Sequence, residues 1–104
     1  MRRGERWWAE LGSPAGRRPV LLLSRDEAYA VRSLVIVAPV TTRVRRIGSE
    51  VPLGLAEGMP RPCVANLDTL TTIPKDCLSS LLISLRSEKM DELDAAIHFA
   101  LGLK

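Results

Sequence analysis

The chain has 104 residues, a hydrophobic share of 46% and a formal net charge of +3 at pH 7. This length allows one domain with a single modest core, spanning residues 1–104. The longest apolar run, Leu34 to Val40, is far too short to cross a membrane, and no apolar leader core follows Met-Arg-Arg at the N-terminus. We therefore expect a soluble cytoplasmic protein that does not enter a membrane.

Positive charge is concentrated in the first part of the chain. Residues 1–61 carry eleven Arg and six acidic residues, a net of +5, whereas residues 62–104 carry four basic and six acidic residues, a net of −2. Twelve of the fifteen basic residues are Arg, whose planar guanidinium suits phosphate groups. The basic part is therefore expected to meet an anion, and a nucleic acid is favoured over a membrane surface.

The first part of the chain is predicted to form strands joined by polar loops. Residues 5–11 alternate between apolar and polar side chains, which is typical of a half-buried strand. A turn-rich Gly-Ser-Pro-Ala-Gly loop follows at 12–16, and the stretch from Arg43 to Ser49 predicts a mobile basic loop. Further strands are predicted at 19–23, 34–40 and 50–53.

The second part adds strands and a terminal helix. Strands are predicted at 63–67 and 81–85, with a helical turn between them that Pro74 begins. A helix is expected to start with Ser87 as its N-cap and to end at Gly102. Its predicted buried stripe, at steps of three and four, is Met90, Leu93, Ile97 and Leu101. Five or more strands and a helix give a mainly β fold with α additions, a small barrel.

Cysteine and histidine usage gives no indication of a metal site. Cys63 and Cys77 are fourteen residues apart and lack the CxxC spacing and His partners of a zinc site. Two reduced, partly buried thiols are the simpler interpretation. His98, the only histidine, follows Asp94 by four residues and is expected on the surface of the helix. Composition alone excludes a ribonuclease mechanism that uses two histidines.

Four short segments follow one another along nearly the whole chain. They are Arg-Gly-Glu-Arg-Trp-Trp at 3–8, Arg-Pro-Val-Leu-Leu-Leu-Ser at 18–24, Val-Ile-Val-Ala-Pro-Val-Thr-Thr at 35–42 and Asp-Thr-Leu-Thr-Thr-Ile at 68–73. Their order and spacing resemble the MazF/PemK family of toxin endoribonucleases. The resemblance implies an SH3-like or CcdB-like barrel, a homodimer, sequence-specific cleavage of single-stranded RNA, and silencing by a small acidic antitoxin.

The resemblance also implies catalytic roles for Arg18 and Thr41. The family's catalytic Arg stands in an Arg-Pro-Val segment, and its catalytic Thr follows an Ala-Pro-hydrophobic segment, as these residues do. RNA can be cut without metal or cofactor if its 2′-hydroxyl attacks the adjacent phosphate and the protein stabilises the phosphorane. The products would carry 2′,3′-cyclic phosphate and 5′-hydroxyl ends. From residue type alone, a surface charge is the favoured interpretation of Arg18, and a strand residue whose hydroxyl is bonded to backbone is the favoured interpretation of Thr41.

The group that moves the protons is less well defined. A free Arg has too high a pKa to serve easily as a base, so Glu5 and Asp68 are the candidates. Asp68 stands at a family position that is often acidic. Near it the chain departs from the family pattern, because Asn66 and Thr71 occupy positions where relatives carry Arg.

Five further residues are candidates for RNA binding. Thr42 stands where the family commonly has Ser. Arg43, Arg45 and Arg46 lie in the following loop and could track the RNA backbone, or simply form a solvated basic loop. Trp8 shares the more polar face of its strand and could stack on a base or fill a dimer contact.

Two other functions are open from the sequence. One is a non-enzymatic toxin on the same fold, resembling CcdB, which inhibits DNA gyrase through its terminal helix. The other is a binding module that has lost activity, motivated by Asn66 and Thr71. The Arg18 and Thr41 pair favours the endoribonuclease, because a gyrase inhibitor does not need it.

Overall fold

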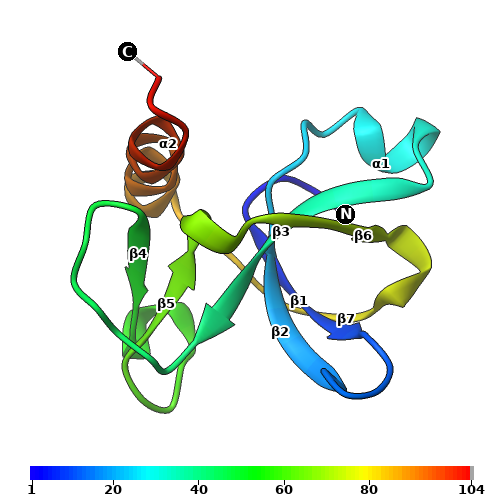
Figure 1. Cartoon of the computed structure of the whole chain (residues 1–104), viewed down its shortest axis with the longest axis horizontal. Helices are drawn as coiled ribbons and strands as arrows, with labels where there is room; N and C mark the ends of the chain where they lie inside the picture. Colours follow the sequence, from blue (N-terminus) through cyan, green and yellow to red (C-terminus); the bar gives the residue numbers. More distant parts are fainter. Residues whose placement is uncertain (104) are drawn as a thin grey trace.

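Seven strands form one antiparallel, strongly curved sheet, with a long helix packed against one end (Figure 1). The structure, a computed structural model, describes residues 1–103. The strands are β1 (Glu5–Glu10), β2 (Arg17–Leu22), β3 (Leu34–Thr41), β4 (Glu50–Leu53), β5 (Cys63–Asn66), β6 (Thr71–Pro74) and β7 (Leu78–Ser84). The helices are α1 (Ala28–Val31) and α2 (Ser87–Leu101), with single turns η1 (Leu55–Glu57), η2 (Leu67–Thr69) and η3 (Lys75–Cys77).

The strand β3 is the centre of the sheet. Val37 pairs with Leu22 of β2 on one edge and with Thr71 of β6 on the other. Beyond it, residues 40–41 of β3 pair with β5, which in turn pairs with β4. The second edge of β3 is thus shared by β6 and β5, so the sheet divides into two lobes at this strand.

Alternating side chains of β2 and β3 enter two separate cores, which is why both strands read as continuous apolar runs. Val20, Val37 and Ile73 belong to a core between β1, β2, β3 and β6. Leu21 and Ala38 face the opposite way, into a larger core closed by β4, β5 and α2. The predicted mainly β barrel with a C-terminal helix is therefore confirmed, with seven strands.

The helix α2 approaches the start of β1 closely. Gly4 has a φ of +89°, and a Cβ atom built there would lie 2.2 Å from Sδ of Met90. Only glycine fits this position without strain, because the backbone is left-handed and the helix occupies the side-chain space. Arg3, next in the chain, pairs with Asp94 on the same helix. Arg3 and Gly4 therefore dock α2 onto the sheet.

Several predicted boundaries were wrong. β6 was missed because it is a four-residue, mostly exposed strand that ends in Pro74. The last strand, β7, begins at Leu78 rather than Leu81. Arg86, not Ser87, is the N-cap of α2, without a side-chain capping bond. Leu101 is 55% exposed, so the buried stripe of α2 ends earlier than the periodicity indicated.

The ends of the helix otherwise follow the sequence signals. Gly102 adopts a left-handed φ of +68° and closes α2, as predicted. His98 is exposed, also as predicted. Within residues 1–103, no helix has the length and the apolar composition that crossing a membrane requires.

Candidate active site

A pocket of about 450 Å³ opens between β2, β3 and β6, over the smaller core. Strand register explains its composition, because side chains two apart on a strand share a face. Arg18 and Val20 of β2 therefore lie beside Pro39 and Thr41 of β3. The full lining is Leu11, Ala15, Arg18, Val20, Val37, Pro39, Val40, Thr41, Thr71 and Ile73. The sheet thus brings together two residues that are 23 positions apart in the sequence.

Arg18 is an exposed cation at the mouth of this apolar pocket. Its Nε donates a hydrogen bond of 2.9 Å to the carbonyl oxygen of Ala15, in the loop between β1 and β2. That bond fixes the stem of the side chain and leaves the two Nη groups available to an anion. A guanidinium above apolar walls binds a phosphate more strongly than it would in open water.

Thr41 is the last residue of β3 and is partly buried. Its Oγ1 accepts a 3.1 Å hydrogen bond from the backbone N–H of Arg43. The hydroxyl is thereby oriented while its own proton is free to be donated. Thr41 can therefore supply a donor to an anionic oxygen next to Arg18. Thr42 is exposed on the bend that follows, and it does not line the pocket.

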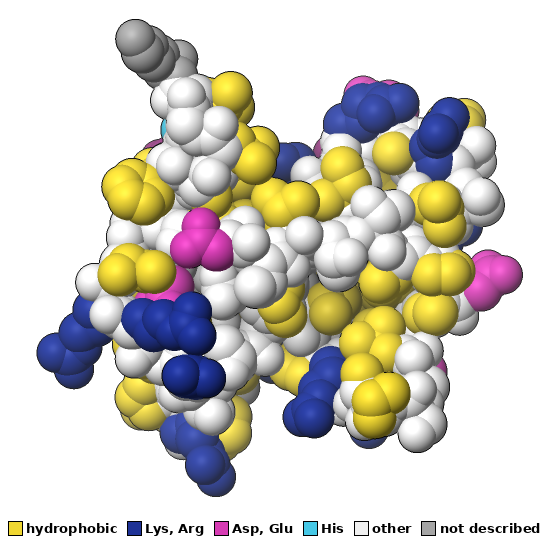
Figure 2. All heavy atoms as spheres, viewed as in Figure 1, with side chains coloured by type: hydrophobic (Ala, Val, Ile, Leu, Met, Phe, Trp, Pro, Cys, Tyr) yellow, Lys and Arg dark blue, Asp and Glu magenta, His cyan; other side chains and the backbone are white. Residues whose placement is uncertain are grey.

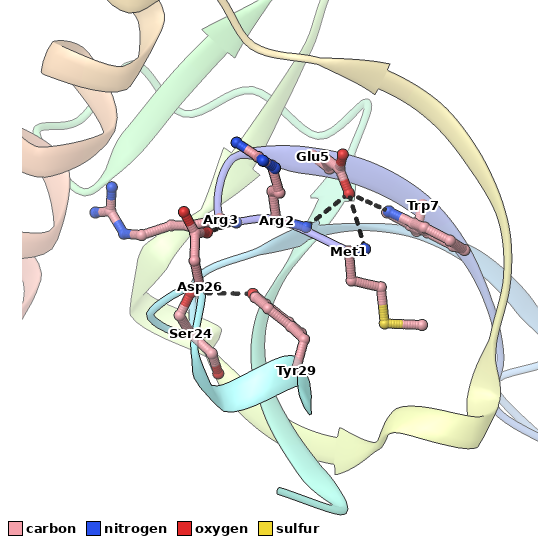
Figure 3. Close-up of polar contacts among 8 residues, drawn as sticks. All are labelled: Met1, Arg2, Arg3, Glu5, Trp7, Ser24, Asp26 and Tyr29. Atoms are coloured by element: carbon pink, nitrogen blue, oxygen red, sulfur yellow. Dashed lines mark hydrogen bonds and ion pairs between the residues drawn. The ribbon is translucent and has the colours of Figure 1, made fainter. Parts of the chain in front are cut away.

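Glu5 lies away from the pocket, at the opposite end of β1 from Glu10, which pairs with Arg17. Figure 3 shows its carboxylate among residues of the N-terminal segment. Oε1 accepts hydrogen bonds from the Arg2 backbone N–H at 2.8 Å and from Trp7 Nε1 at 3.0 Å, and lies 4.0 Å from the Met1 ammonium. The geometry gives Glu5 the task of holding this segment against β1.

Asp68 is also separate from the pocket. It lies on η2, where its Oδ2 accepts a 2.6 Å hydrogen bond from the hydroxyl of Ser49 and its backbone N–H donates to Asn66. This contact ties η2 to the end of the basic loop. Among the described residues that line the pocket, none is a carboxylate or a histidine.

The basic loop begins directly after Thr41, and none of its residues 43–49 is among those that line the pocket. Arg43, Arg45 and Arg46 are all exposed, and none takes part in the four ion pairs found within residues 1–103. Figure 2 shows basic side chains gathered over this loop, between β3 and β4. The backbone of the loop is nevertheless held in place, because the N–H groups of Arg45 and Arg46 donate hydrogen bonds to the buried carboxylate of Glu50.

Trp8 lies on the other face of β1. It pairs with Pro19, whereas its neighbour Ala9 pairs with Arg18, so the Trp8 side chain points away from the face that carries the pocket. The Arg17 guanidinium stacks over the indole ring at 4.4 Å from its centroid, and Glu10 pairs with Arg17. The structure therefore does not bring Trp8 to the pocket.

Of the ten residues that line the pocket, the sequence predicted only Arg18 and Thr41 as site residues. Pro39 forms part of the wall opposite Val20, and Thr71 forms the edge contributed by β6. From the sequence, Thr71 was noted only because relatives carry Arg at this position, since the strand β6 was not predicted. Its spacing, three residues after Asp68 in a segment shared with relatives, was the available signal.

Cys63 lies in the larger core, and Cys77 packs against the smaller one. Burial raises the pKa of the Cys63 thiol, while the nearby Arg6 opposes that shift. Cys63 and Cys77 are both free thiols, as expected. Within residues 1–103, no group of three or more His, Cys, Asp or Glu side chains is arranged to hold a metal ion.

Fold and pocket together define a small β-barrel protein that presents a cation and a hydroxyl in an apolar pocket, beside a basic loop. A model of the PemK-like, MazF-like toxins of type II toxin–antitoxin systems matches residues 2–101. The chain belongs to this family.

Similar proteins include a curated relative and solved structures. Endoribonuclease MazF3 of Mycobacterium tuberculosis is 42% identical over 86 residues, which cover 83% of this chain and 84% of that protein. The structure of the Mycobacterium tuberculosis toxin MazF-mt6 is similar with a TM-score of 0.87 at 33% identity, covering 96% of this chain and 98% of that one. A mycobacterial endoribonuclease in complex with its cognate antitoxin has a TM-score of 0.88 at 28% identity, covering 100% and 97%.

Proposed function

We propose that this protein is the endoribonuclease toxin of a type II toxin–antitoxin system and cleaves single-stranded RNA at a short sequence. One observation carries the proposal, namely that Arg18 and Thr41 line a single pocket. Family membership supports it, as do the relatives that are named endoribonucleases. The expected alternative, a CcdB-like gyrase inhibitor, does not account for a cation and a hydroxyl in one pocket.

The chemistry follows from what the pocket holds. The RNA 2′-oxygen forms a bond to phosphorus while the bond from phosphorus to the 5′-oxygen breaks, which gives a 2′,3′-cyclic phosphate and a 5′-hydroxyl. The Nη groups of Arg18 donate to the nonbridging oxygens, whose negative charge grows in the phosphorane. The hydroxyl of Thr41 donates to one of them. Neither step requires a metal ion or another cofactor.

Proton movement is assigned to water at the open mouth of the pocket. The 2′-hydroxyl must lose a proton and the 5′-oxygen must gain one. Glu5 and Asp68 are engaged in other contacts, and neither lines the pocket. The protein therefore contributes mainly charge stabilisation and orientation, and neither carboxylate acts as the base in the proposed mechanism.

The partners follow from charge and from the solved relatives. The exposed arginines after Thr41 fit both an RNA backbone and an acidic antitoxin. An antitoxin is present in one solved relative. A second copy of the chain is expected to cover the exposed apolar side chains near the end of α2, including Phe99 and Leu103. We place the complex in the cytoplasm.

The test is cleavage of a defined RNA by the purified protein in excess EDTA. We expect cleavage to persist, with 5′-hydroxyl ends that polynucleotide kinase labels directly and cyclic phosphates at the 3′ ends. Loss of cleavage on chelation, restored by Mg²⁺, would contradict the mechanism. Inhibition of DNA gyrase supercoiling without any RNA cleavage would instead support the CcdB-like alternative.

A further inference from the structure

Glu50, the first residue of β4, is a buried carboxylate whose only described partners are backbone amides of the basic loop. It is 8% exposed. Its Oε1 accepts hydrogen bonds from the N–H of Arg45 at 3.0 Å and from the N–H of Arg46 at 2.9 Å, and Oε2 lies 3.3 Å from the N–H of Arg45. Burial of a carboxylate is costly, and these charge-assisted bonds offset that cost.

The amide contacts fix the shape of the loop at an unusual point. Arg46 has a φ of +59°, a left-handed conformation that costs a non-glycine residue about 1 kcal/mol or more. Glu50 accepts hydrogen bonds from the two consecutive peptide N–H groups, of Arg45 and Arg46, that lead into this conformation. It therefore stabilises a bend that Arg46 would otherwise avoid.

The contacts leave the guanidinium groups free. Glu50 bonds backbone N–H groups and takes part in none of the ion pairs found within residues 1–103. With their amides turned toward the carboxylate, Arg45 and Arg46 keep exposed side chains. A buried carboxylate in a basic loop thus shapes the loop without pairing with its positive side chains.

Further contacts hold the loop at both ends. At the β3 end, the Arg43 N–H donates to Oγ1 of Thr41. At the β4 end, Ser49 bonds to η2 through Leu67 N–H and Asp68 Oδ2, and Gly48 lies under the Phe99 ring. Arg45 and Arg46 lie between these anchors, where, among residues 1–103, Glu50 is the one side chain that accepts hydrogen bonds from their amides.

We propose that Glu50 is a positioning residue for RNA cleavage. It holds Arg45 and Arg46 in the register in which they contact the RNA backbone beside the cut, and so it sets affinity and sequence selectivity. It is not a catalytic residue, because it does not line the pocket of Arg18 and Thr41. This inference rests on the proposed function.

The experiment compares Glu50→Ala and Glu50→Gln with the control Glu57→Ala. Glu57 is also a buried carboxylate that accepts a backbone hydrogen bond, from Gly54 at 2.7 Å, but in the neighbouring loop. Each variant is assayed by single-turnover cleavage over a range of RNA concentrations, by sequencing of 5′ ends from a long RNA, and by amide hydrogen exchange of residues 43–50.

We expect Glu50→Ala to raise the half-saturating RNA concentration about tenfold, the order that one charge-assisted hydrogen bond contributes. The rate at saturation should stay within about threefold of wild type, since Arg18 is untouched. Cleavage sites should become less uniform, and the amides of Arg45 and Arg46 should exchange faster. Glu50→Gln, which keeps one acceptor oxygen, should restore most of the wild-type behaviour.

Three outcomes would overturn the inference. The amides of Arg45 and Arg46 could stay protected in Glu50→Ala, the saturated rate could collapse as in Arg18→Ala, or Glu57→Ala could produce the same changes. If Glu50→Ala does not fold, the test is made with Glu50→Gln. A changed half-saturating RNA concentration in Glu50→Gln, with wild-type hydrogen exchange at the amides of Arg45 and Arg46, would then also overturn the inference. If the proposed function is wrong, the wild-type protein will cleave no RNA, although Glu50 still protects the amides of Arg45 and Arg46 from exchange.

Discussion

Arg18 and Arg45 differ in what surrounds them, and under the proposed function this difference gives Arg18 a catalytic role and Arg45 an RNA-binding role. Arg18 is fixed by its bond to Ala15 and lines an apolar pocket, whereas Arg45 projects from an exposed loop. A fixed donor inside a pocket can favour the transition state over the ground state, while an exposed loop cation contributes mainly a phosphate contact.

The first prediction follows from this difference. Arg18→Ala should slow single-turnover cleavage at saturating enzyme by roughly a hundredfold or more, the range for removing a transition-state donor. Arg45→Ala should leave that rate near wild type and reduce the salt dependence of RNA binding by about one charge. A wild-type saturated rate for Arg18→Ala would show that the catalytic cation is another residue.

Tyr29, the only tyrosine, gives a prediction about pH. Its hydroxyl donates to the carbonyl oxygen of Ser24 (Figure 3), and burial raises the pKa of Tyr29 to about 12. The folded-state pKa lies above the unfolded value near 10. The contribution of this pKa difference to the free energy of unfolding is therefore fully present below pH 10 and is lost as the pH rises toward 12.

Phenolate absorbance measures this shift directly because the chain has a single Tyr. The midpoint should lie near pH 12 in the native protein and, as for any free tyrosine, near 10 in denaturant. Tyr29→Phe should remove the part of the alkaline loss of unfolding free energy that the phenol causes, about 3 kcal/mol. A native midpoint at pH 10 would mean that the hydroxyl is not buried.

The strand β1 buries side chains on both of its faces. Trp7 packs on the smaller core, whereas Arg6 on the opposite face is only 7% exposed. Within residues 1–103, its Nε and Nη1 have no hydrogen-bond partner, and burial lowers the pKa of Arg6. Burying polar nitrogens without partners destabilises the folded state.

Arg6→Met should therefore stabilise the protein. Met has a comparable length and no polar hydrogens, so we expect the free energy of unfolding to rise by about 1–3 kcal/mol in urea titrations. Arg25→Met, at an exposed position, is the control and should change stability little. A loss of stability in Arg6→Met would show that the guanidinium has a favourable partner in the native protein.

At the scale of the whole molecule, apolar side chains gather on one surface. Phe99 is 66% exposed at the end of α2 and packs over Gly48 of the basic loop, where Ile47 is also exposed. Figure 2 shows hydrophobic side chains on this helix and beside it. A patch of this kind on a small protein is typical of an association surface.

We accordingly expect a dimer at micromolar concentration, measured by light scattering. Phe99→Asp should shift the protein toward monomer, because it places a charge on the apolar surface. His98→Asp, at the adjacent exposed position, is the control for added charge on the helix. A wild-type monomer that cleaves RNA at full rate would argue against a dimer-dependent site.

The sequence alone determined six of the seven strands, the terminal helix and the two residues that meet in the pocket. Apolar runs marked β2 and β3 because both strands are buried on both faces, and Gly102 marked the helix end because it needs a left-handed φ. Arg18 and Thr41 were identified through local segments that relatives share. These signals are all local in the sequence, so they can be recognised without the tertiary structure.

Tertiary structure decided what depends on pairing between distant segments. It placed Glu5 and Asp68 in contacts away from the pocket and brought Thr71 to its edge through β6. It also bonded Glu50 to the basic loop. No local pattern encodes these outcomes, because strand register and the burial of a single charge are set by the whole sheet.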